Sequence, residues 1–290
     1  MRLSVLVTSY ESPETLRSCL DSLSRQPEAE EILVADGSAK DPSPDLAPLF
    51  PRVRFFHVPD LVTVPRLRWA AFRKSRGEVV AAVEARCVPS PGWCRTLLES
   101  HDRHPQAPAI GGPVGIAEPA SAFDLGLYFS EYGLFPPPVA ERRAKSLSGA
   151  NLSWKREFLE QASDLLDAGA WETRIHERWL REGRPLFLCP AGVVFRNTMR
   201  PPRAILQRFH YGRGYAAGRV AGRPAARLPF AAASVLLPFL LTVRAAIRAR
   251  PPWRGRFLRG LPWLAFLNAI WSLGEFTGYL TGEPGRPRNF

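Results

Sequence analysis

Residues 79–92 read VVAAVEARCVPSPG, a stretch in which a short apolar run meets two charged residues and then a turn. The apolar run, residues 79–83, has the length of a buried strand, and Pro-Ser-Pro-Gly ends the segment. Glu84 and Arg86 stand two residues apart, so in an extended chain their side chains point to the same side. Charged groups at the carboxyl end of a buried strand are typical of the ligand site of an α/β protein.

The residues before this stretch alternate between strand-like and helix-like patterns. The strand-like segments are SVLVTSY (4–10), EEILVADGS (30–38), VRFFHVP (53–59) and VVAAVEAR (79–86). The helix-like segments are PETLRSCLDSLSRQ (13–26) and VPRLRWAAFRKSRGE (64–78). This alternation predicts an α/β fold with a mostly parallel, doubly wound sheet, which places Tyr10, Asp36 and Glu84 at strand ends.

After residue 90 the strand-like and helix-like patterns alternate less regularly. PGWCRTLLESHDRHP (91–105) and WETRIHERWLREG (171–183) are helix-like, and IGGPVG (110–115) is predicted to be a short strand. Residues 117–145 are rich in proline and aromatic residues without a clear period, which predicts an irregular loop lining the site.

Length and composition set the class of protein. The 290 residues are 46% apolar, enough for one large domain or a domain with an appendage. The four cysteines show neither metal-binding nor paired spacing, which is typical of a reducing compartment. The apolar stretch at residues 3–7 is too short for the hydrophobic region of a signal peptide. We therefore expect this part of the protein in the cytosol.

The net charge of +12 comes from one part of the chain. Residues 1–182 contain 22 basic and 25 acidic residues, whereas residues 183–274 contain 15 arginines and no acidic residue. This basic segment is also strongly apolar, a combination that suits an anionic membrane surface better than a nucleic-acid groove. We therefore expect a membrane partner and no nucleic acid, although the same charge would attract a polyanion.

Two apolar segments follow in the tail, LPFAAASVLLPFLLTV (228–243) and LPWLAFLNAIWSLGEFTGYL (261–280), separated by a region with six arginines. The first is about the shortest length that can span a bilayer and contains two prolines. Two crossings would also leave the arginines outside, against the positive-inside tendency. Residues 223–290 are therefore predicted to form a helical hairpin lying in or on the cytoplasmic leaflet. A soluble helical subdomain is the alternative.

Several stretches together resemble family 2 glycosyltransferases of the A-type fold. The matching stretches appear in the family's order over residues 1–220: SVLVTSYES, EEILVADGS, RGEVV, VEARCVPSPGW, SGANLSWKR, WETRIHERWLREG and QRFHYGRGYAAGR. The resemblance implies an enzyme that transfers a sugar from a nucleoside-diphosphate donor with inversion. It also implies a catalytic domain at 1–222, in which 1–115 bind the donor and 116–222 bind the acceptor.

The resemblance assigns the donor site to residues at the strand ends and on the second helix: Ser9, Tyr10, Glu11, Asp36, Arg68, Glu84 and Arg86. Some of these residues have another explanation. Asp36 precedes Gly37-Ser38 and could cap a turn. Tyr10 could serve packing alone. Arg66 competes with Arg68 for the role of facing the nucleotide.

The resemblance also raises the question of a metal ion. At the end of the fourth strand the family has Asp-x-Asp, whose second carboxylate binds the divalent cation that neutralises the donor diphosphate. Here Glu84 occupies the first position and Arg86 the last. Mg²⁺ or Mn²⁺ could still bind weakly at Glu84. Our hypothesis is that Arg86 takes over part of the metal's task by binding diphosphate oxygens. A surface ion pair in a protein that has lost activity is the alternative.

An inverting transfer needs a carboxylate that takes the proton of the acceptor hydroxyl. By its distance from Gly183, Glu172 occupies the position of the family's aspartate base, with one more methylene. Glu172 could instead only favour the dipole of its helix. His176, one turn further, could lie on the same face.

The acceptor or phosphate site is predicted from two further matches. SGAN, with Gly149 and Asn151, resembles a turn that contacts donor phosphates or acceptor, and Trp154 could stack on a sugar or lie in the core. QRFHYGRGYAAGR resembles a relaxed form of the family's Gln-x-x-Arg-Trp element. It adds three residues as phosphate ligands: Gln207, Arg208 and Arg213.

These observations predict an inverting glycosyltransferase of the cell envelope that adds a single sugar to a lipid or lipid-linked acceptor at the cytoplasmic face of the membrane. The single transfer follows from the departure from the element that processive synthases carry. The main alternative is a non-catalytic nucleotide-sugar-binding protein with a degenerate metal site.

Overall fold

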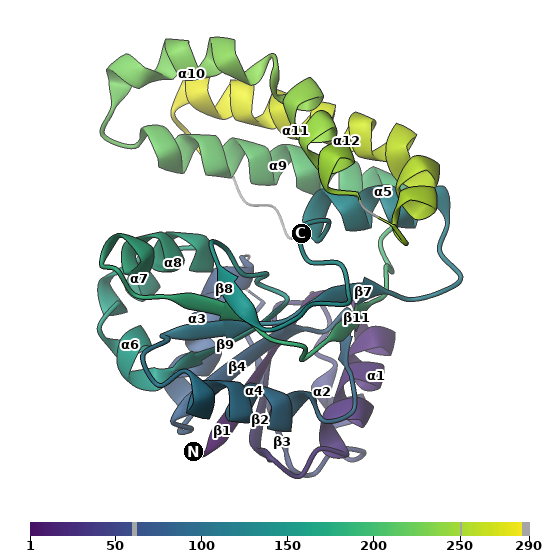
Figure 1. Ribbon diagram of the computed structural model, residues 1–290, viewed down its shortest axis with the longest axis vertical. Helices are drawn as coiled ribbons and strands as arrows, with labels where there is room; N and C mark the ends of the chain where they lie inside the picture. Colours follow the sequence, from purple (N-terminus) through teal and green to yellow (C-terminus); the bar gives the residue numbers. More distant parts are fainter. Residues whose placement is uncertain (60–62, 250, 286–290) are drawn as a thin grey trace. The chain divides into compact units, whose positions relative to one another are not determined.

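The computed structural model describes residues 1–59, 63–249 and 251–285 (Figure 1). The chain forms two compact units. The first unit contains Met1–Gly115 and Phe135–Thr198, and the second contains Ile116–Leu134 and Met199–Phe290. Residue 250 and residues 286–290 of the predicted hairpin lie outside the described residues.

The first unit is built on an eight-stranded sheet of order β3-β2-β1-β4-β9-β6-β10-β8. Its strands are β1 (Leu3–Ser9), β2 (Ala29–Asp36), β3 (Val53–His57), β4 (Val79–Glu84), β6 (Ala109–Gly111), β8 (Arg142–Ala144), β9 (Asn151–Lys155) and β10 (Leu186–Leu188). The first four are parallel, and β9 runs antiparallel between β4 and β6. This mixed α/β sheet confirms the predicted fold class.

A three-stranded sheet, in the order β5-β11-β7, lies in the same part of the chain. Its strands are β5 (Cys87–Pro89), β7 (Val114–Ile116) and β11 (Val193–Phe195). The predicted strand 79–86 thus ends at Glu84, because the chain turns at residues 85 and 86 before β5 begins at Cys87. Likewise, IGGPVG contributes to two short strands in different sheets.

Helices pack on the large sheet through apolar faces. They are α1 (Pro13–Ser24), α2 (Ser43–Leu46), α3 (Val64–Lys74), α4 (Trp93–Arg103), α6 (Arg156–Glu160), α7 (Ser163–Asp167) and α8 (Glu172–Arg181). One core cluster includes three tryptophans, Trp69, Trp154 and Trp179, all at most 1% exposed. Its burial of large apolar side chains fixes α3 and α8 against the sheet.

The second unit contains α5 (Ala122–Glu131), α9 (Pro201–Val220), the 3₁₀ turn Pro224–Ala226, α10 (Arg227–Ser234), α11 (Leu237–Arg248) and α12 (Arg254–Thr281). Helix α5 lies inside the predicted loop 117–145, so that prediction is wrong for these residues. A reciprocal capping box, in which Ser121 and Asp124 bond each other's backbone, begins this helix.

Glycines bring α9 and α12 together closely. A Cβ atom at Gly212 would overlap the Trp271 carbonyl oxygen, and one at Gly274 would overlap that of Phe209. Because α9 packs along α12 in this way, residues 199–222 belong to the same compact unit as the tail. The units therefore divide at other residues than the predicted boundary at 222/223, and the tail helices pack with α5 and α9 rather than only with each other.

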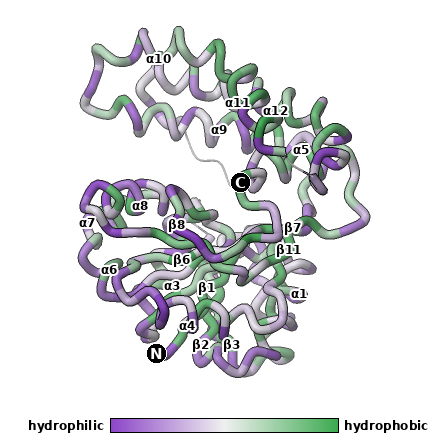
Figure 2. Tube along the Cα trace, in the orientation of Figure 1, coloured by the Kyte–Doolittle hydropathy of each residue, from purple (hydrophilic) through white to green (hydrophobic). Residues whose placement is uncertain are grey.

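No single helix among the described residues is long and apolar enough to cross a membrane. The pair Pro224–Ser234 and Leu237–Arg248 passes that test together, with a bend of 63° between its two parts. Large apolar side chains are exposed along this pair, including Leu236 (63%), Phe239 (70%) and Ile247 (75%). Figure 2 colours much of the trace of α11 as hydrophobic.

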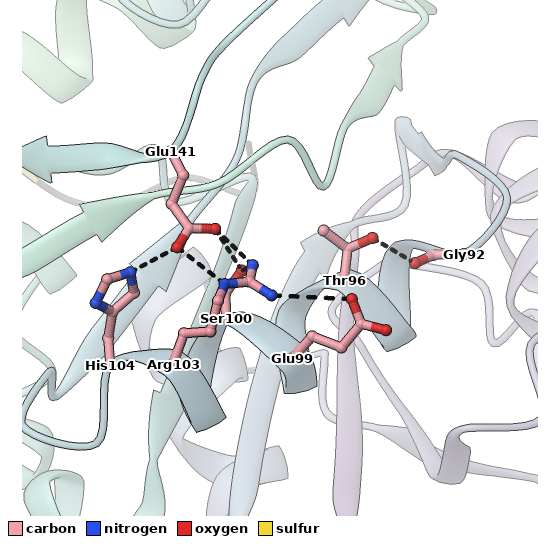
Figure 3. Close-up of polar contacts among 7 residues, drawn as sticks. All are labelled: Gly92, Thr96, Glu99, Ser100, Arg103, His104 and Glu141. Carbon is pink, nitrogen blue, oxygen red and sulfur yellow. Dashed lines mark hydrogen bonds and ion pairs between the residues drawn. The ribbon is translucent and has the colours of Figure 1, made fainter.

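An ion-pair cluster fixes the segment before β8 to the end of α4 (Figure 3). Glu141 accepts hydrogen bonds from Arg103 Nη2 at 2.5 Å and from His104 Nε2 at 2.6 Å. The His104 ring stacks on Phe187 with 3.7 Å between the ring centroids. The pKa of the Glu141 carboxyl is lowered to about 2, mainly by the hydrogen bond from Arg103.

This cluster predicts an acid-dependent loss of stability. A carboxyl whose pKa is lower in the folded than in the unfolded protein stabilises the fold above its unfolded pKa, and this contribution disappears as the pH falls through the folded value. Glu141→Gln should therefore be less stable than the wild type at neutral pH and equally stable near pH 2. Urea denaturation across this pH range measures the difference. A difference that stays constant with pH would contradict this role of Glu141.

Candidate active site

Strand register brings the predicted donor residues to one edge of the sheet. Ser9 pairs with Asp36 across β1 and β2, and Thr8 pairs with Glu84 across β1 and β4. Because β1, β2 and β4 are parallel, their carboxyl ends meet at the same edge. Asp36 and Glu84 therefore flank the end of β1, as the sequence predicted.

Asp36 is 2% exposed and acts as the cap of the turn that follows it. Its carboxylate accepts hydrogen bonds from the Ser38 amide at 2.9 Å and from Ser38 Oγ at 3.0 Å. His57 Nδ1 lies 3.4 Å from the same carboxylate. The turn interpretation is thus present in the structure, and binding of a base or ribose by Asp36 stays a prediction. Sequence reasoning missed His57, which reaches Asp36 only through the β2–β3 pairing.

The loop after β1 is tied to this turn. The Glu11 amide donates to Ser38 Oγ at 2.7 Å, and the Ala39 amide donates to Glu11 Oε1 at 2.8 Å. Glu11 has a φ of 48°, a left-handed conformation that these two bonds help to hold. Ser9 is 2% exposed, and its Oγ has no hydrogen-bond partner among the described residues. Tyr10 lies between them and is half-buried.

Glu84 and Arg86 contact each other at the end of β4. Arg86 Nη2 lies 3.5 Å from Glu84 Oε2, and the two side chains are 14% and 19% exposed, respectively. The Arg86 guanidinium also lies over the Phe195 ring, 5.2 Å from its centroid. The turn at residues 85 and 86, rather than an extended strand, brings these groups together.

This arrangement does not fit an ordinary site for a divalent cation. Mg²⁺ and Mn²⁺ need several oxygen ligands, and a guanidinium beside the carboxylate repels a cation. The described residues include no group of three His, Cys, Asp or Glu side chains that could hold a metal ion. Metal binding at Glu84 stays a prediction, and the chemistry below uses the side chains alone.

Glu172 is held in a buried ion pair with Arg68. Arg68 Nη1 donates to Glu172 Oε2 at 2.7 Å, and the two side chains are 1% and 7% exposed. Arg68 Nη2 donates to the Gly149 carbonyl at 2.8 Å. Arg68 thus contacts the predicted base, and its predicted binding of the nucleotide donor stays a prediction. Arg66, the other arginine considered for the nucleotide, is exposed, whereas Arg68 is buried.

Gly149 allows the carboxylate to lie this close to the backbone. A Cβ atom at Gly149 would overlap the Glu172 carboxylate, so only glycine fits here without a shift. Gly149 lies two residues before Asn151. Asn151 pairs with Val83, the residue before Glu84. This register brings the Glu172 carboxylate to the same sheet edge as Asp36 and Glu84.

Two predicted ligand residues are part of the core instead. Trp154 is fully buried, with its ring centroid 5.5 Å from that of Trp69, and it cannot stack on a sugar in this position. Its Nε1 donates to His176 Nε2 at 3.3 Å. Burial, with a contribution from Arg68, lowers the pKa of His176 to about 3. His176 is therefore neutral and structural.

Asn151 is also fully buried. Its Nδ2 donates to the carbonyls of Pro113 at 2.9 Å and Ala191 at 2.8 Å, and its Oδ1 accepts from Trp93 Nε1 at 2.8 Å. All three bonds join the turn to neighbouring segments, so Asn151 positions Gly149 rather than a ligand. The other predicted phosphate ligands, Gln207, Arg208 and Arg213, belong to the second unit, where Arg213 Nε donates to the Glu283 carbonyl at 3.1 Å.

Comparisons with known proteins agree with this geometry. Residues 4–134 match the family model "Glycosyl transferase family 2". One similar solved structure is GalNAc-T7 with UDP, GalNAc and Mn²⁺, with a TM-score of 0.52 and 15% identity over 69% of this chain and 45% of that one. Another is the mannosyltransferase PcManGT from Pyrobaculum calidifontis with GDP-Man and Mn²⁺, with a TM-score of 0.51 and 17% identity over 97% of this chain and 74% of that one.

The chain thus spans less than half of the GalNAc-T7 structure. No curated protein matches its sequence. Parallel strands with carboxylates at one edge, together with these likenesses, show the A-type fold of glycosyltransferases. Residues 4–134 are thus similar to family 2 glycosyltransferases, the family that the motifs resemble.

The Arg68–Glu172 pair predicts strong coupling between two side chains that are 104 positions apart in the sequence. Arg68→Met and Glu172→Met should each lower the free energy of unfolding by about 3–5 kcal/mol, because each leaves a buried charge unpaired. The double variant should lose much less than the sum. Arg66→Met, at an exposed position, should change stability by less than about 0.5 kcal/mol. Urea denaturation of the four variants tests this, and additive losses would contradict the pairing.

Proposed function

We propose that the protein transfers a single sugar, with inversion, from a nucleoside-diphosphate donor to a lipid-linked acceptor at the cytoplasmic face of the membrane. The observation that carries the proposal is the Glu172 carboxylate. It is fixed by Arg68 at the sheet edge that also carries Asp36 and Glu84. A fixed carboxylate beside a donor site is what an inverting transfer requires.

The reaction follows from these positions. The acceptor hydroxyl oxygen attacks the anomeric carbon while the bond from that carbon to the donor diphosphate breaks. Glu172 takes the hydroxyl proton, and the nucleoside diphosphate leaves with the electron pair of the broken bond. The Arg68 guanidinium remains on the carboxylate and sets its orientation, so Arg68 is a positioning residue in this account.

The donor class is supported by the edge residues and by the two similar structures, which hold UDP and GDP-Man. Both of those structures also hold Mn²⁺. In this chain Arg86 occupies the place where the resemblance puts the metal-binding aspartate. Its guanidinium supplies positive charge and paired donors for diphosphate oxygens, which offsets the charge that develops on the leaving group.

The membrane location is supported by the second unit. The bent pair of α10 and α11 exposes large apolar side chains such as Phe239 and Ile247. Residues 183–274, which include this pair, carry 15 arginines and no acidic residue. Apolar side chains can enter the lipid interface while arginines bind anionic headgroups, which would hold the enzyme beside a lipid-linked acceptor.

A non-catalytic nucleotide-sugar-binding protein is the second candidate. It is favoured by the guanidinium beside Glu84 and by the ion pair that engages Glu172. Release of nucleoside diphosphate from donor and acceptor by the purified protein would exclude this candidate. A protein that binds donors and never releases product would support it.

Glu172→Gln tests the base. The variant keeps the size of the side chain but cannot accept the proton, so kcat should fall by about 100-fold or more. The KM for the donor should change little, because Glu172 does not bind the diphosphate in this account. Initial rates of nucleoside diphosphate release measure both values. If Glu172→Gln turns over at the wild-type rate, another group is the base.

Arg86→Ala tests the diphosphate partner. Loss of the guanidinium should weaken nucleoside diphosphate binding by about tenfold or more, measured by titration calorimetry with a chelator present. Arg95→Ala is the matched control, because Arg95 forms an exposed ion pair with Glu28 on the same unit. The affinity of this control should match the wild type. Unchanged affinity in Arg86→Ala would refute the role of Arg86.

A further inference from the structure

Helix α9 carries a buried arginine that lacks an acceptor. Arg208 is 7% exposed and lies over the Trp271 ring, 4.5 Å from its centroid. Within the described residues it forms no hydrogen bond and no ion pair, and its Nε is buried without a partner. Glu131 favours the charged form electrostatically without forming an ion pair with Arg208.

This charge is costly for the folded protein. Burial lowers the pKa of the Arg208 guanidinium, but an arginine remains protonated. Removing an unpaired charge from water costs several kcal/mol. The contact with the Trp271 ring returns only about 0.5–2 kcal/mol. The Trp271 ring and the charge of Glu131 therefore offset only part of the cost of burying this positive charge.

Another arginine on the same helix, Arg219, has both a ring contact and a hydrogen-bond acceptor. Arg219 lies over the Phe230 ring at 4.4 Å, in the same kind of contact as Arg208 over Trp271. Its Nη1 also donates to Tyr279 Oη at 3.3 Å. The two arginines thus share a ring contact, but within the described part of the chain only Arg219 of the two has a hydrogen-bond acceptor.

The Trp271 ring, over which Arg208 lies, is itself held in place by hydrogen bonds. Trp271 Nε1 donates to Glu275 Oε1 at 2.5 Å, and Tyr279 Oη donates to Glu275 Oε2 at 2.8 Å. Glu275 is 5% exposed, so this network is buried. Next to Arg208 in the sequence, Gln207 is 6% exposed, and its Oε1 is also buried without a described partner. The structure thus holds the ring in place, while Gln207 Oε1 and Arg208 Nε have no hydrogen-bond partner among the described residues.

We propose that Arg208 binds the phosphate group of the lipid carrier to which the acceptor sugar of the proposed reaction is linked. A guanidinium matches phosphate oxygens with paired donors, and a buried guanidinium gains most from such a partner. The same unit exposes apolar side chains on α10 and α11, which suit a hydrocarbon chain. The link between this carrier and the acceptor rests on the proposed function, whereas the phosphate site rests on Arg208 alone.

Vesicle binding tests the site. The probes are phosphatidylcholine vesicles that contain either a polyprenyl phosphate or the same fraction of phosphatidylglycerol, and inorganic phosphate in solution. Arg208→Gln should bind the polyprenyl phosphate vesicles about tenfold or more weakly than the wild type and bind phosphatidylglycerol vesicles equally. Arg219→Gln, the matched control, should equal the wild type on both.

Three results would overturn the proposal. Equal binding of Arg208→Gln and wild type to polyprenyl phosphate vesicles would show that Arg208 does not bind the lipid phosphate. An equal loss on both kinds of vesicle would mean general attraction to anionic lipid. Stabilisation of the wild type by inorganic phosphate as large as that by the polyprenyl phosphate vesicles would assign the site to the free anion.

Thermal unfolding separates a ligand site from a structural role. Without ligand, Arg208→Gln should be as stable as the wild type or more stable, because an unpaired buried charge is removed. If Arg208 only supports packing, the variant should melt lower, which would count against the proposal. Nucleoside diphosphates should stabilise both proteins equally. If they stabilise neither, the proposed function fails, while the vesicle result still decides the phosphate site.

Discussion

The buried ion pair between Arg68 and Glu172 is the interaction on which the proposed chemistry depends. It joins helix α3 to the first residue of α8, and the second Arg68 bond fixes the Gly149 carbonyl in the turn before β9. Neither side chain forms another ion pair with a residue that the structure describes, so this pair holds the segments in one arrangement. That arrangement presents a carboxylate at the edge where the parallel strands end.

A second consequence concerns positive charge. An A-type glycosyltransferase must neutralise a leaving diphosphate, and two carboxylates with a cation are one solution. Here the end of β4 carries a carboxylate and a guanidinium in contact. The guanidinium is part of the chain, so its charge is present whether or not a divalent ion is bound. The same reasoning supports the phosphate site proposed at Arg208, whose Nε has no partner among the described residues.

Much of the first unit could be predicted from sequence, because its strands and helices are local patterns. Asp36 and Glu84 were placed at strand ends correctly, since a short apolar run followed by a turn marks where a buried strand stops. Helix α5 was missed because its residues are apolar without a clear period. The Ser121–Asp124 capping box was the one local signal that could have revealed it.

The contacts of several candidate site residues could not be predicted from the sequence, for one common reason. Arg68, Asn151 and Trp154 are polar or aromatic residues in motif positions, and only long-range packing shows that their side chains face the protein interior. The partner of Arg68 lies 104 positions away, beyond any local pattern. In the same way, the close approach of α9 to α12 depends on glycines that face each other across two helices, which a single sequence does not reveal.

A crystal structure of the protein with a non-hydrolysable nucleotide-sugar analogue would test the central claim most directly. The distance from the Glu172 carboxylate to the anomeric carbon, and the partner of the Arg68 guanidinium, are the quantities to measure. We predict that the carboxylate faces the anomeric carbon with room for one hydroxyl between them, while Arg68 still binds Glu172. A sugar bound away from Glu172, or Arg68 released to the diphosphate, would contradict the account.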